Sequence, residues 1–182
     1  MTKQIEIPLS KNKLYLIVFG SLLFVIAGIW LITSPNQFQN ISINFLDNLN
    51  LIKSIGILSI LFFGITGIYG IRKISDNRAG LIIDKKGITD NSNASSIGLI
   101  EWNDITEIKT EVVGMSTRFI MINVNDPEKY IKKATSNLKS KLMRANMKMY
   151  GTPLSITANT LNYDFDKLEQ LVESEYSKNK YD

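Results

Sequence analysis

Residues 54–73 read SIGILSILFFGITGIYGIRK, and this stretch decides the fold of the chain. Residues 54–71 carry no charge, and Arg72 and Lys73 end the apolar run abruptly. Extended back to Leu51, the segment is long enough to cross a hydrocarbon core of about 30 Å. About ten Ile, Leu and Phe side chains, at roughly −0.3 to −0.6 kcal/mol each, favour insertion into a bilayer. We therefore expect a membrane-spanning helix over residues 51–71.

A second stretch of the same kind precedes it. Residues 14–33, LYLIVFGSLLFVIAGIWLIT, contain no charged residue. They are too long for the apolar region of a cleavable signal peptide, and the Ser-Pro-Asn that follows is not a small-residue cleavage site. Tyr15 and Trp30 lie where aromatic side chains prefer the two membrane interfaces. Two such stretches argue against a buried helix of a soluble protein and predict a transmembrane hairpin over residues 14–73.

The distribution of cations predicts the orientation of this hairpin. The cations that flank it are Lys3, Lys11, Lys13, Arg72, Lys73 and Arg78. Residues 34–50, between the two stretches, contain neither Lys nor Arg. Because positively charged flanks stay on the cytoplasmic side, we expect a multi-pass protein of the cytoplasmic (inner) membrane with both termini in the cytoplasm. The high content of Ile, Asn and Lys suggests an AT-rich bacterial genome.

The segment between the two stretches has an apolar pattern of its own. Its large apolar residues recur at helical spacing: Phe38, Ile41, Phe45, Leu46 and Leu49. This pattern indicates a short amphipathic helix that lies in the membrane interface.

Small residues form a strip on each expected membrane helix, and such strips let helix backbones approach closely in lipid. The members are Gly20, Ser21, Ala27 and Gly28 in the first helix and Gly56, Ser59, Gly67 and Gly70 in the second. Two interpretations remain open. Either the strips pack the two helices of one chain together, or one strip joins two copies of the chain in a homo-oligomer.

Composition limits the available chemistry. The chain has no Cys and no His, which removes disulfides, thiolate nucleophiles, the commonest metal ligand and the usual general base. Carboxylate, Lys, Tyr and Ser/Thr chemistry remains, but no paired-carboxylate motif is present. We expect no catalytic residue, no metal site and no cofactor, and we predict that the protein is not an enzyme.

Residues 1–13 are expected to form a polar cytoplasmic arm, and residues 76–182 a soluble domain. Pro8 and the alternation IEIPL over residues 5–9 favour an extended arm, which either adds an edge strand to the domain or stays disordered. In the domain, short β-type runs separated by turn residues predict an antiparallel meander. The expected strands cover residues 79–83, 87–90, 97–102, 105–113, 118–124 and 152–157, with a polar loop at 91–96.

Two helices are expected in the second half of the domain. Asp126-Pro127-Glu128 is a helix start, with an N-cap Asp, a Pro at the first helical position and an acid in the first turn. From Tyr130 to about Met149 an apolar stripe keeps helical spacing: Ile131, Ala134, Leu138, Leu142, Ala145 and Met149. A final helix is expected over residues 164–177, with Phe165, Leu168, Leu171 and Val172 facing inward.

Cations occupy the side of the expected long helix opposite that stripe. They are Lys129, Lys132, Lys133, Lys141, Arg144 and Lys148, with Lys139 toward the side. These six form a candidate face for anionic lipid headgroups, because each cation near an anionic leaflet contributes about 1 kcal/mol. The alternative is a solvated face on a helix whose apolar stripe packs on the domain. The connector 74–77 reaches only about 15 Å when extended, so the domain stays near the membrane in either case.

Three segments carry a resemblance to a known family. They are LIIDKKGITDN at residues 81–91, IGLIEWNDI at 97–105 and YGTPLSI at 150–156. They look like segments of small bacterial membrane proteins that carry a pleckstrin-homology-like (PH-like) domain after a two-helix hairpin, and Trp102, Asp104 and Ile105 match the W-x-D-I element of those proteins. The resemblance implies an antiparallel β-barrel or sandwich with a C-terminal helix, in which we expect Trp102 and Ile105 to be structural core residues.

The expected fold class is therefore an α+β membrane protein with a transmembrane hairpin and a cytoplasmic PH-like domain. The expected function is a membrane-tethered binding or scaffold module that contacts a protein partner or anionic lipid at the inner leaflet, with no nucleic-acid partner. The alternative is a component of a membrane transport or channel complex. Against that alternative, neither apolar stretch contains the internal charge that marks an ion or substrate pathway.

Overall fold

The computed structural model describes residues 4–38, 48–114 and 117–180, and the chain divides into two compact units. One unit is a pair of helices within residues 11–77. The other, which we call the α+β unit, combines residues that precede Lys11 with residues that follow Asn77. The arm and the soluble domain, which the sequence suggested separately, are parts of one folded unit.

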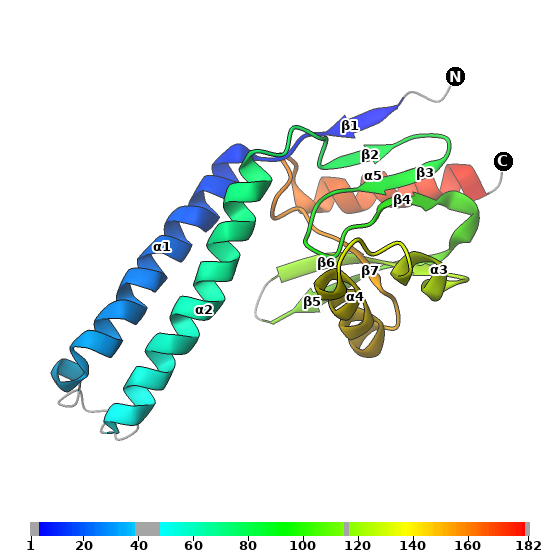
Figure 1. Ribbon diagram of the computed structural model, residues 1–182. Coiled ribbons are helices and arrows are strands. Elements are labelled where there is room, and N and C mark those ends of the chain that lie inside the picture. Colours follow the sequence, from blue (N-terminus) through cyan, green and yellow to red (C-terminus); the bar gives the residue numbers. More distant parts are fainter. Residues whose placement is uncertain (1–3, 39–47, 115–116, 181–182) are drawn as a thin grey trace. The chain divides into compact units, whose positions relative to one another are not determined.

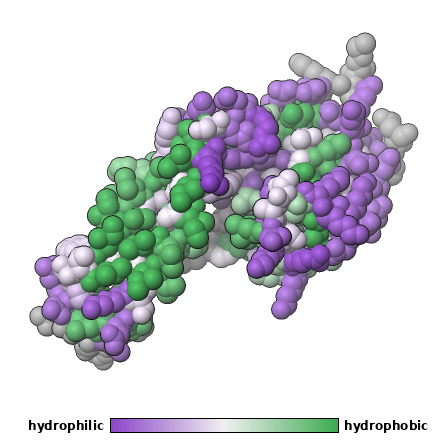
Figure 2. All heavy atoms as spheres, in the orientation of Figure 1, coloured by the Kyte–Doolittle hydropathy of each residue, from purple (hydrophilic) through white to green (hydrophobic). Residues whose placement is uncertain are grey.

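The helical unit consists of α1 (Lys11–Thr33) and α2 (Leu49–Ile74) (Figure 1). With 23 and 26 residues, they are about 35 and 39 Å long at 1.5 Å per residue. By length and composition both helices could therefore cross a membrane. Figure 2 shows apolar surface over much of this unit, and most of its large apolar side chains are exposed. An apolar surface of this extent needs an apolar environment or a partner.

Small residues bring α1 and α2 into contact. A Cβ atom added at Gly28 would lie 2.8 Å from the backbone oxygen of Gly56, and one added at Gly56 would lie 2.7 Å from that of Gly28. The hydroxyl of Ser59 donates to the carbonyl of Phe24 at 2.9 Å. The rings of Phe24 and Phe63 stack with their centroids 4.2 Å apart. At this crossing the small residues join the two helices of one chain.

A short 3-10 helix, η1 (Pro35–Phe38), follows α1. The expected amphipathic helix falls mostly on residues 39–47, which lie outside the described residues. Leu49, its last expected member, is the first residue of α2, where the side chain of Asn48 accepts hydrogen bonds as the N-cap.

Two antiparallel sheets form the α+β unit. The first sheet contains, in spatial order, β1 (Ile5–Ile7), β2 (Leu81–Ile83), β3 (Gly87–Asp90) and β4 (Gly98–Glu101), and the second contains β5 (Ile105–Val113), β6 (Thr117–Val124) and β7 (Leu154–Ile156). The arm is an edge strand, with Ile5 opposite Ile83 and Ile7 opposite Leu81. The short β-type runs between turn residues therefore located β2 to β7 close to their observed bounds.

Of the expected barrel or sandwich, the closed barrel is not formed, because the two sheets do not close. The chain passes from β4 to β5 through a 3-10 turn, η3 (Trp102–Asp104), and no pairing joins the two sheets among the described residues. Closure requires long, staggered strands, whereas the strands of the first sheet have only three or four residues.

The core lies between the sheets and under α5 (Phe165–Lys180). Ile120 and Ile122 on β6 contribute fully buried side chains, and Phe165, Leu168 and Val172 bury one side of α5. Trp102 and Ile105 are each 6% exposed. The indole N–H of Trp102 donates to the carbonyl of Asp84 at 2.8 Å, which satisfies its one polar group inside the core.

The single long helix expected from Tyr130 to Met149 is also wrong. The chain forms α3 (Pro127–Ile131) and α4 (Asn137–Tyr150) instead. Asp126 caps α3 as expected, but Ser136 is extended and its hydroxyl accepts the Lys139 N–H at 3.2 Å, which begins a second helix. Ser is a better N-cap than interior helix residue. The cap at Ser136 therefore overrides the continuous apolar spacing.

The apolar stripe on α4 does not pack inward. Met143 is the residue that α4 buries, whereas Leu138 and Met149 are 64% and 63% exposed. The spacing correctly predicted that these apolar residues share one side of the helix. That side is exposed, whereas it was expected to pack on the domain.

The close approach of α1 and α2 can be tested with two isoleucine substitutions. Gly56→Ile places a branched side chain where a Cβ atom already meets backbone at 2.7 Å, and overpacking costs about 1–3 kcal/mol. We expect a lower melting temperature of the full-length chain in detergent, followed by circular dichroism. Gly64→Ile is the matched control, because an added Cβ at Gly64 has nothing within 4 Å. Equal melting temperatures for both variants would contradict the assigned crossing.

Candidate functional site

The six cations expected to form one face are divided among three segments. Lys129 lies on α3, Lys132 and Lys133 follow it, and the remaining three lie on α4. The break at Ser136 removes the common helical face that the sequence suggested. The six cations differ in their contacts, and Lys132 is exposed.

Lys129 is engaged within the unit. Its Nζ lies 2.6 Å from Oδ2 of Asp104 and 3.2 Å from Oε1 of Glu101, and the hydroxyl of Tyr130 donates to the same Asp104 oxygen at 2.6 Å. The hydrogen bond from Lys129 is the main cause that lowers the pKa of Asp104, with that from Tyr130 next. Burial, together with Asp104, raises the pKa of Tyr130 to about 12. This cluster connects α3 to η3.

Arg144 is engaged in the same way. Its guanidinium donates to both carboxylate oxygens of Glu128, at 2.7 and 3.1 Å, and thereby connects α4 to α3. The hydrogen bond from Arg144 lowers the pKa of Glu128. Lys133 lies over the ring of Tyr130, 4.6 Å from its centroid. Lys141 and Lys148 are exposed on α4.

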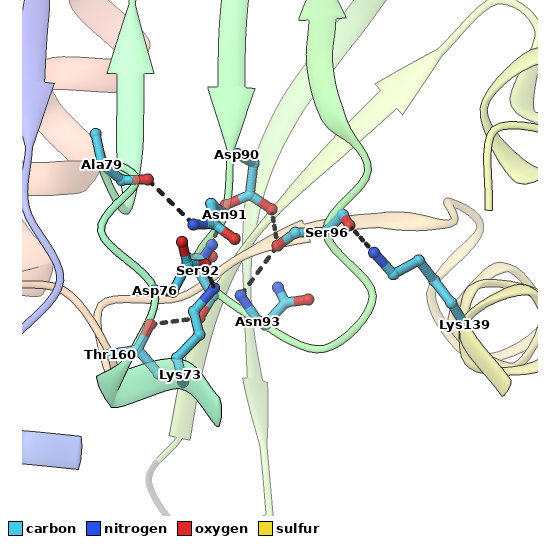
Figure 3. A network of polar contacts seen from close by, with 10 residues as sticks. All are labelled: Lys73, Asp76, Ala79, Asp90, Asn91, Ser92, Asn93, Ser96, Lys139 and Thr160. Atoms are coloured by element: carbon cyan, nitrogen blue, oxygen red, sulfur yellow. Dashed lines mark hydrogen bonds and ion pairs between the residues drawn. The ribbon is translucent and has the colours of Figure 1, made fainter. Parts of the chain in front are cut away.

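A largely buried polar loop, residues 91–96, joins β3 to β4 within the first sheet (Figure 3). Asp90, which precedes it at the end of β3, is only 4% exposed. Its carboxylate accepts the backbone N–H of Ser92 at 2.8 Å and the hydroxyl of Ser96. The side chain of Asn93 donates to the carbonyl of Ser155 on β7 at 2.5 Å. A loop of ordinary polar composition is thus part of the interior.

The same loop reaches α4 and the segment before α5. The Nζ atom of Lys139 donates to the carbonyl of Ser96 at 2.7 Å, as Figure 3 shows. The hydroxyl of Thr160 donates to the carbonyl of Ser92, and the N–H of Thr157 donates to the Ser92 hydroxyl at 3.1 Å. These contacts fix the backbone of the loop and the position of the Lys139 ammonium group.

A cavity of about 410 Å³ adjoins this loop, and we call it the basic cavity. Strands β2, β3 and β4 contribute to its lining, together with the loop, the α3–α4 connector and the first turn of α4. The polar and charged residues that line it are Arg78, Thr89, Asp90, Asn91, Ser96, Lys133, Thr135 and Lys139. This lining includes three cations and one carboxylate. Three positive side chains and one negative side chain give the lining a net positive charge.

The lining of the basic cavity supplies hydrogen-bond donors rather than reactive groups. Ammonium, guanidinium, hydroxyl and amide groups bind phosphate and carboxylate oxygens, and Arg and Lys do so most strongly. In the part of the chain that the structure describes, no three His, Cys, Asp or Glu residues are grouped to hold a metal ion. The arrangement therefore suits recognition of an anion.

Comparison with protein-family models, with curated proteins and with solved structures finds no match for this chain.

Sequence reasoning reached only part of the basic cavity. The sequence predicts Lys133 as a member of the candidate lipid face. It places Lys139 at the edge of that face and uses Arg78 only as a cation that flanks the hairpin. Asp90 was read as the end of a strand. A signal did exist in DNSNASS at residues 90–96, because Asp, Asn and Ser side chains in such runs bond to nearby backbone and order a loop.

The Asp104 cluster predicts acid sensitivity. In the folded protein Asp104 has a pKa below its ordinary value of 3.8. Its stabilising contribution is therefore present above about pH 4 and is lost as the pH falls through the folded pKa. We expect Asp104→Asn to lower the free energy of unfolding at pH 7 and to flatten its decline in acid. Urea titrations at a series of pH values would measure both effects.

Glu173→Gln is the control for this experiment, because it removes one exposed acid on α5. Its stability should follow the parent across the same pH range. An acid decline in Asp104→Asn as steep as that of the parent would exclude Asp104 as its source.

Proposed function

We propose that this protein is a membrane-anchored binding module whose α+β unit binds an anionic group in the basic cavity. In this proposal α1 and α2 span the cytoplasmic membrane of a bacterium, and both termini and the α+β unit are cytoplasmic. The ligand carries a phosphate or carboxylate group, which either a lipid headgroup or a soluble molecule can supply. The protein acts by binding and not by catalysis.

The observation that carries this proposal is the cavity with its three cations. Arg78, Lys133 and Lys139 come from three separate segments, yet they line one cavity beside an ordered loop. The hydrogen bond between Lys139 and Ser96 fixes one of these cations before any ligand arrives. Preorganised donors bind more tightly, because less side-chain entropy is lost on association.

The topology of the α+β unit supports a binding module in a second way. A four-stranded sheet, a three-stranded sheet and a C-terminal helix are compatible with the PH-like domain that the sequence resembles, and here the first strand precedes the two long helices. The helices α3 and α4 are an insertion between the sixth and seventh strands. Because a fold does not determine function, the ligand class is argued from the cavity alone.

Ligand binding can be tested through thermal stability. A ligand that binds only the folded state raises the melting temperature, so phosphate or glycerol phosphate should stabilise the full-length chain relative to chloride at equal ionic strength. Lys133→Gln/Lys139→Gln should abolish this shift. Lys85→Gln/Lys86→Gln removes the same charge from the exposed β2–β3 turn and should retain it. Equal shifts in all three proteins would contradict the proposal.

The source of the anion can be separated in the same preparation. Phospholipid that co-purifies with the parent, but not with Lys133→Gln/Lys139→Gln, would indicate a lipid headgroup. A shift with soluble phosphate and no difference in bound lipid would indicate a soluble ligand.

The proposed sidedness predicts which residues an impermeant thiol reagent can reach. Because the chain has no Cys, single cysteines can be placed at Gln37 in η1 and at Asn103 in η3, both of which are exposed. In intact cells we expect labelling at Gln37 and protection at Asn103 until the membrane is permeabilised. The reverse pattern would show that the α+β unit lies outside the cytoplasm.

A further inference from the structure

The outward side of α4 presents apolar residues at helical spacing. Leu138, Leu142, Ala145 and Met149 follow one another at intervals of four, three and four residues, which places them on one side of an α-helix. All four are exposed, and Leu142, the least exposed of the three large side chains, is still 38% exposed. We call these four residues the α4 stripe.

Packing does not account for the α4 stripe. Met143, on another side of the helix, is fully buried in the core. Lys139 and Asn146 connect α4 to the rest of the unit through Ser96 and Ser155, at 2.7 and 3.4 Å. Arg144 also connects α4 to Glu128 of α3. None of these contacts uses a residue of the α4 stripe.

The α4 stripe is bordered by cations on one side and by an apolar groove on the other. Within the observed bounds of α4, helical spacing puts Lys141 and Lys148, both exposed, along one border of the α4 stripe rather than opposite it. Along the other border the apolar surface continues into a groove of about 280 Å³, which Leu142 and Met149 share with Val113 and Phe119 of the second sheet. The result is a continuous apolar surface with cations on one side.

We propose that the α4 stripe lies in the headgroup region of an anionic bilayer, with α4 parallel to the membrane plane. An exposed helix with Leu and Met on one side and Lys beside them is the pattern of interfacial membrane helices. The inference rests on the proposed membrane anchoring, and it does not depend on the basic cavity.

An anionic bilayer fits this surface because the two components of its chemistry match. The α4 stripe and the groove supply apolar area for the acyl boundary, while Lys141 and Lys148 supply charge for the headgroups. The chain also limits the distance: Ser10 is bonded within the α+β unit and Lys11 already begins α1, while residues 75–77 separate α2 from Arg78. A domain of roughly a hundred residues has a radius of gyration of about 13 Å. The α4 stripe therefore remains within a short distance of any bilayer that the hairpin crosses.

A fluorescent probe on the α4 stripe tests this inference in the full-length chain. Ala145→Cys introduces the only thiol, which is labelled with bimane and reconstituted in phosphatidylcholine vesicles with or without phosphatidylglycerol. A nitroxide near the headgroup of a tracer lipid quenches bimane at close range. We expect stronger quenching in the vesicles that contain phosphatidylglycerol, and we expect salt to reduce it.

Charge-matched variants identify the residues responsible. Lys141→Gln/Lys148→Gln should lower the ratio of docked to undocked α4 by about five-fold for each Lys removed. Lys85→Gln/Lys86→Gln should leave that ratio unchanged. Chain that incorporates into vesicles and resists alkaline extraction, but shows equal and weak quenching in both lipids, would overturn this inference alone. Chain that is extracted by alkali would overturn the anchoring and this inference with it.

Discussion

The α+β unit depends on one buried carboxylate. Burying a charge is costly unless hydrogen bonds compensate for the lost water, and the loop that follows Asp90 folds back to supply them through Ser92 and Ser96. Once folded, this loop presents its own carbonyl and amide groups to β7, to α4 and to the segment before α5. The wall of the basic cavity and the position of α4 both follow from this arrangement.

Local patterns predicted the elements of this chain better than their environments. Short β-type runs bounded by turn residues located β2, β3, β5 and β6, and the unbroken apolar runs located α1 and α2. In both cases the signal lies within one element and its immediate flanks. The N-terminal strand β1 stayed undecided, since three residues carry too little periodicity to distinguish an edge strand from a disordered arm.

The sequence alone does not predict which segments of the chain pack against one another. The helix α4 has apolar residues on more than one side, and periodicity alone does not say which side the second sheet covers; Met143 is buried and Leu142 is not. Residues 91–96 look like an exposed loop by composition, because their burial depends on Asp90 and on strands more than fifty residues away. Tertiary packing also brings Arg78 beside Lys133 and Lys139 in the basic cavity, and no spacing along the chain predicts this. The insertion of α3 and α4 between β6 and β7 thus contributes to both proposed binding surfaces.

The pairing of β1 with β2 has a consequence for how the chain folds. These neighbouring strands are separated along the chain by both long helices, so β1 is synthesised first and has no partner until the hairpin is complete. Closing a loop of this length costs entropy that grows with the number of flexible residues. Once α1 and α2 are paired, the end of α2 lies near the start of α1, and most of that entropy cost is removed. We therefore expect α1 and α2 to pair before the first sheet assembles. Protease resistance of the α+β unit that appears, during synthesis, before α1 and α2 have paired would contradict this order.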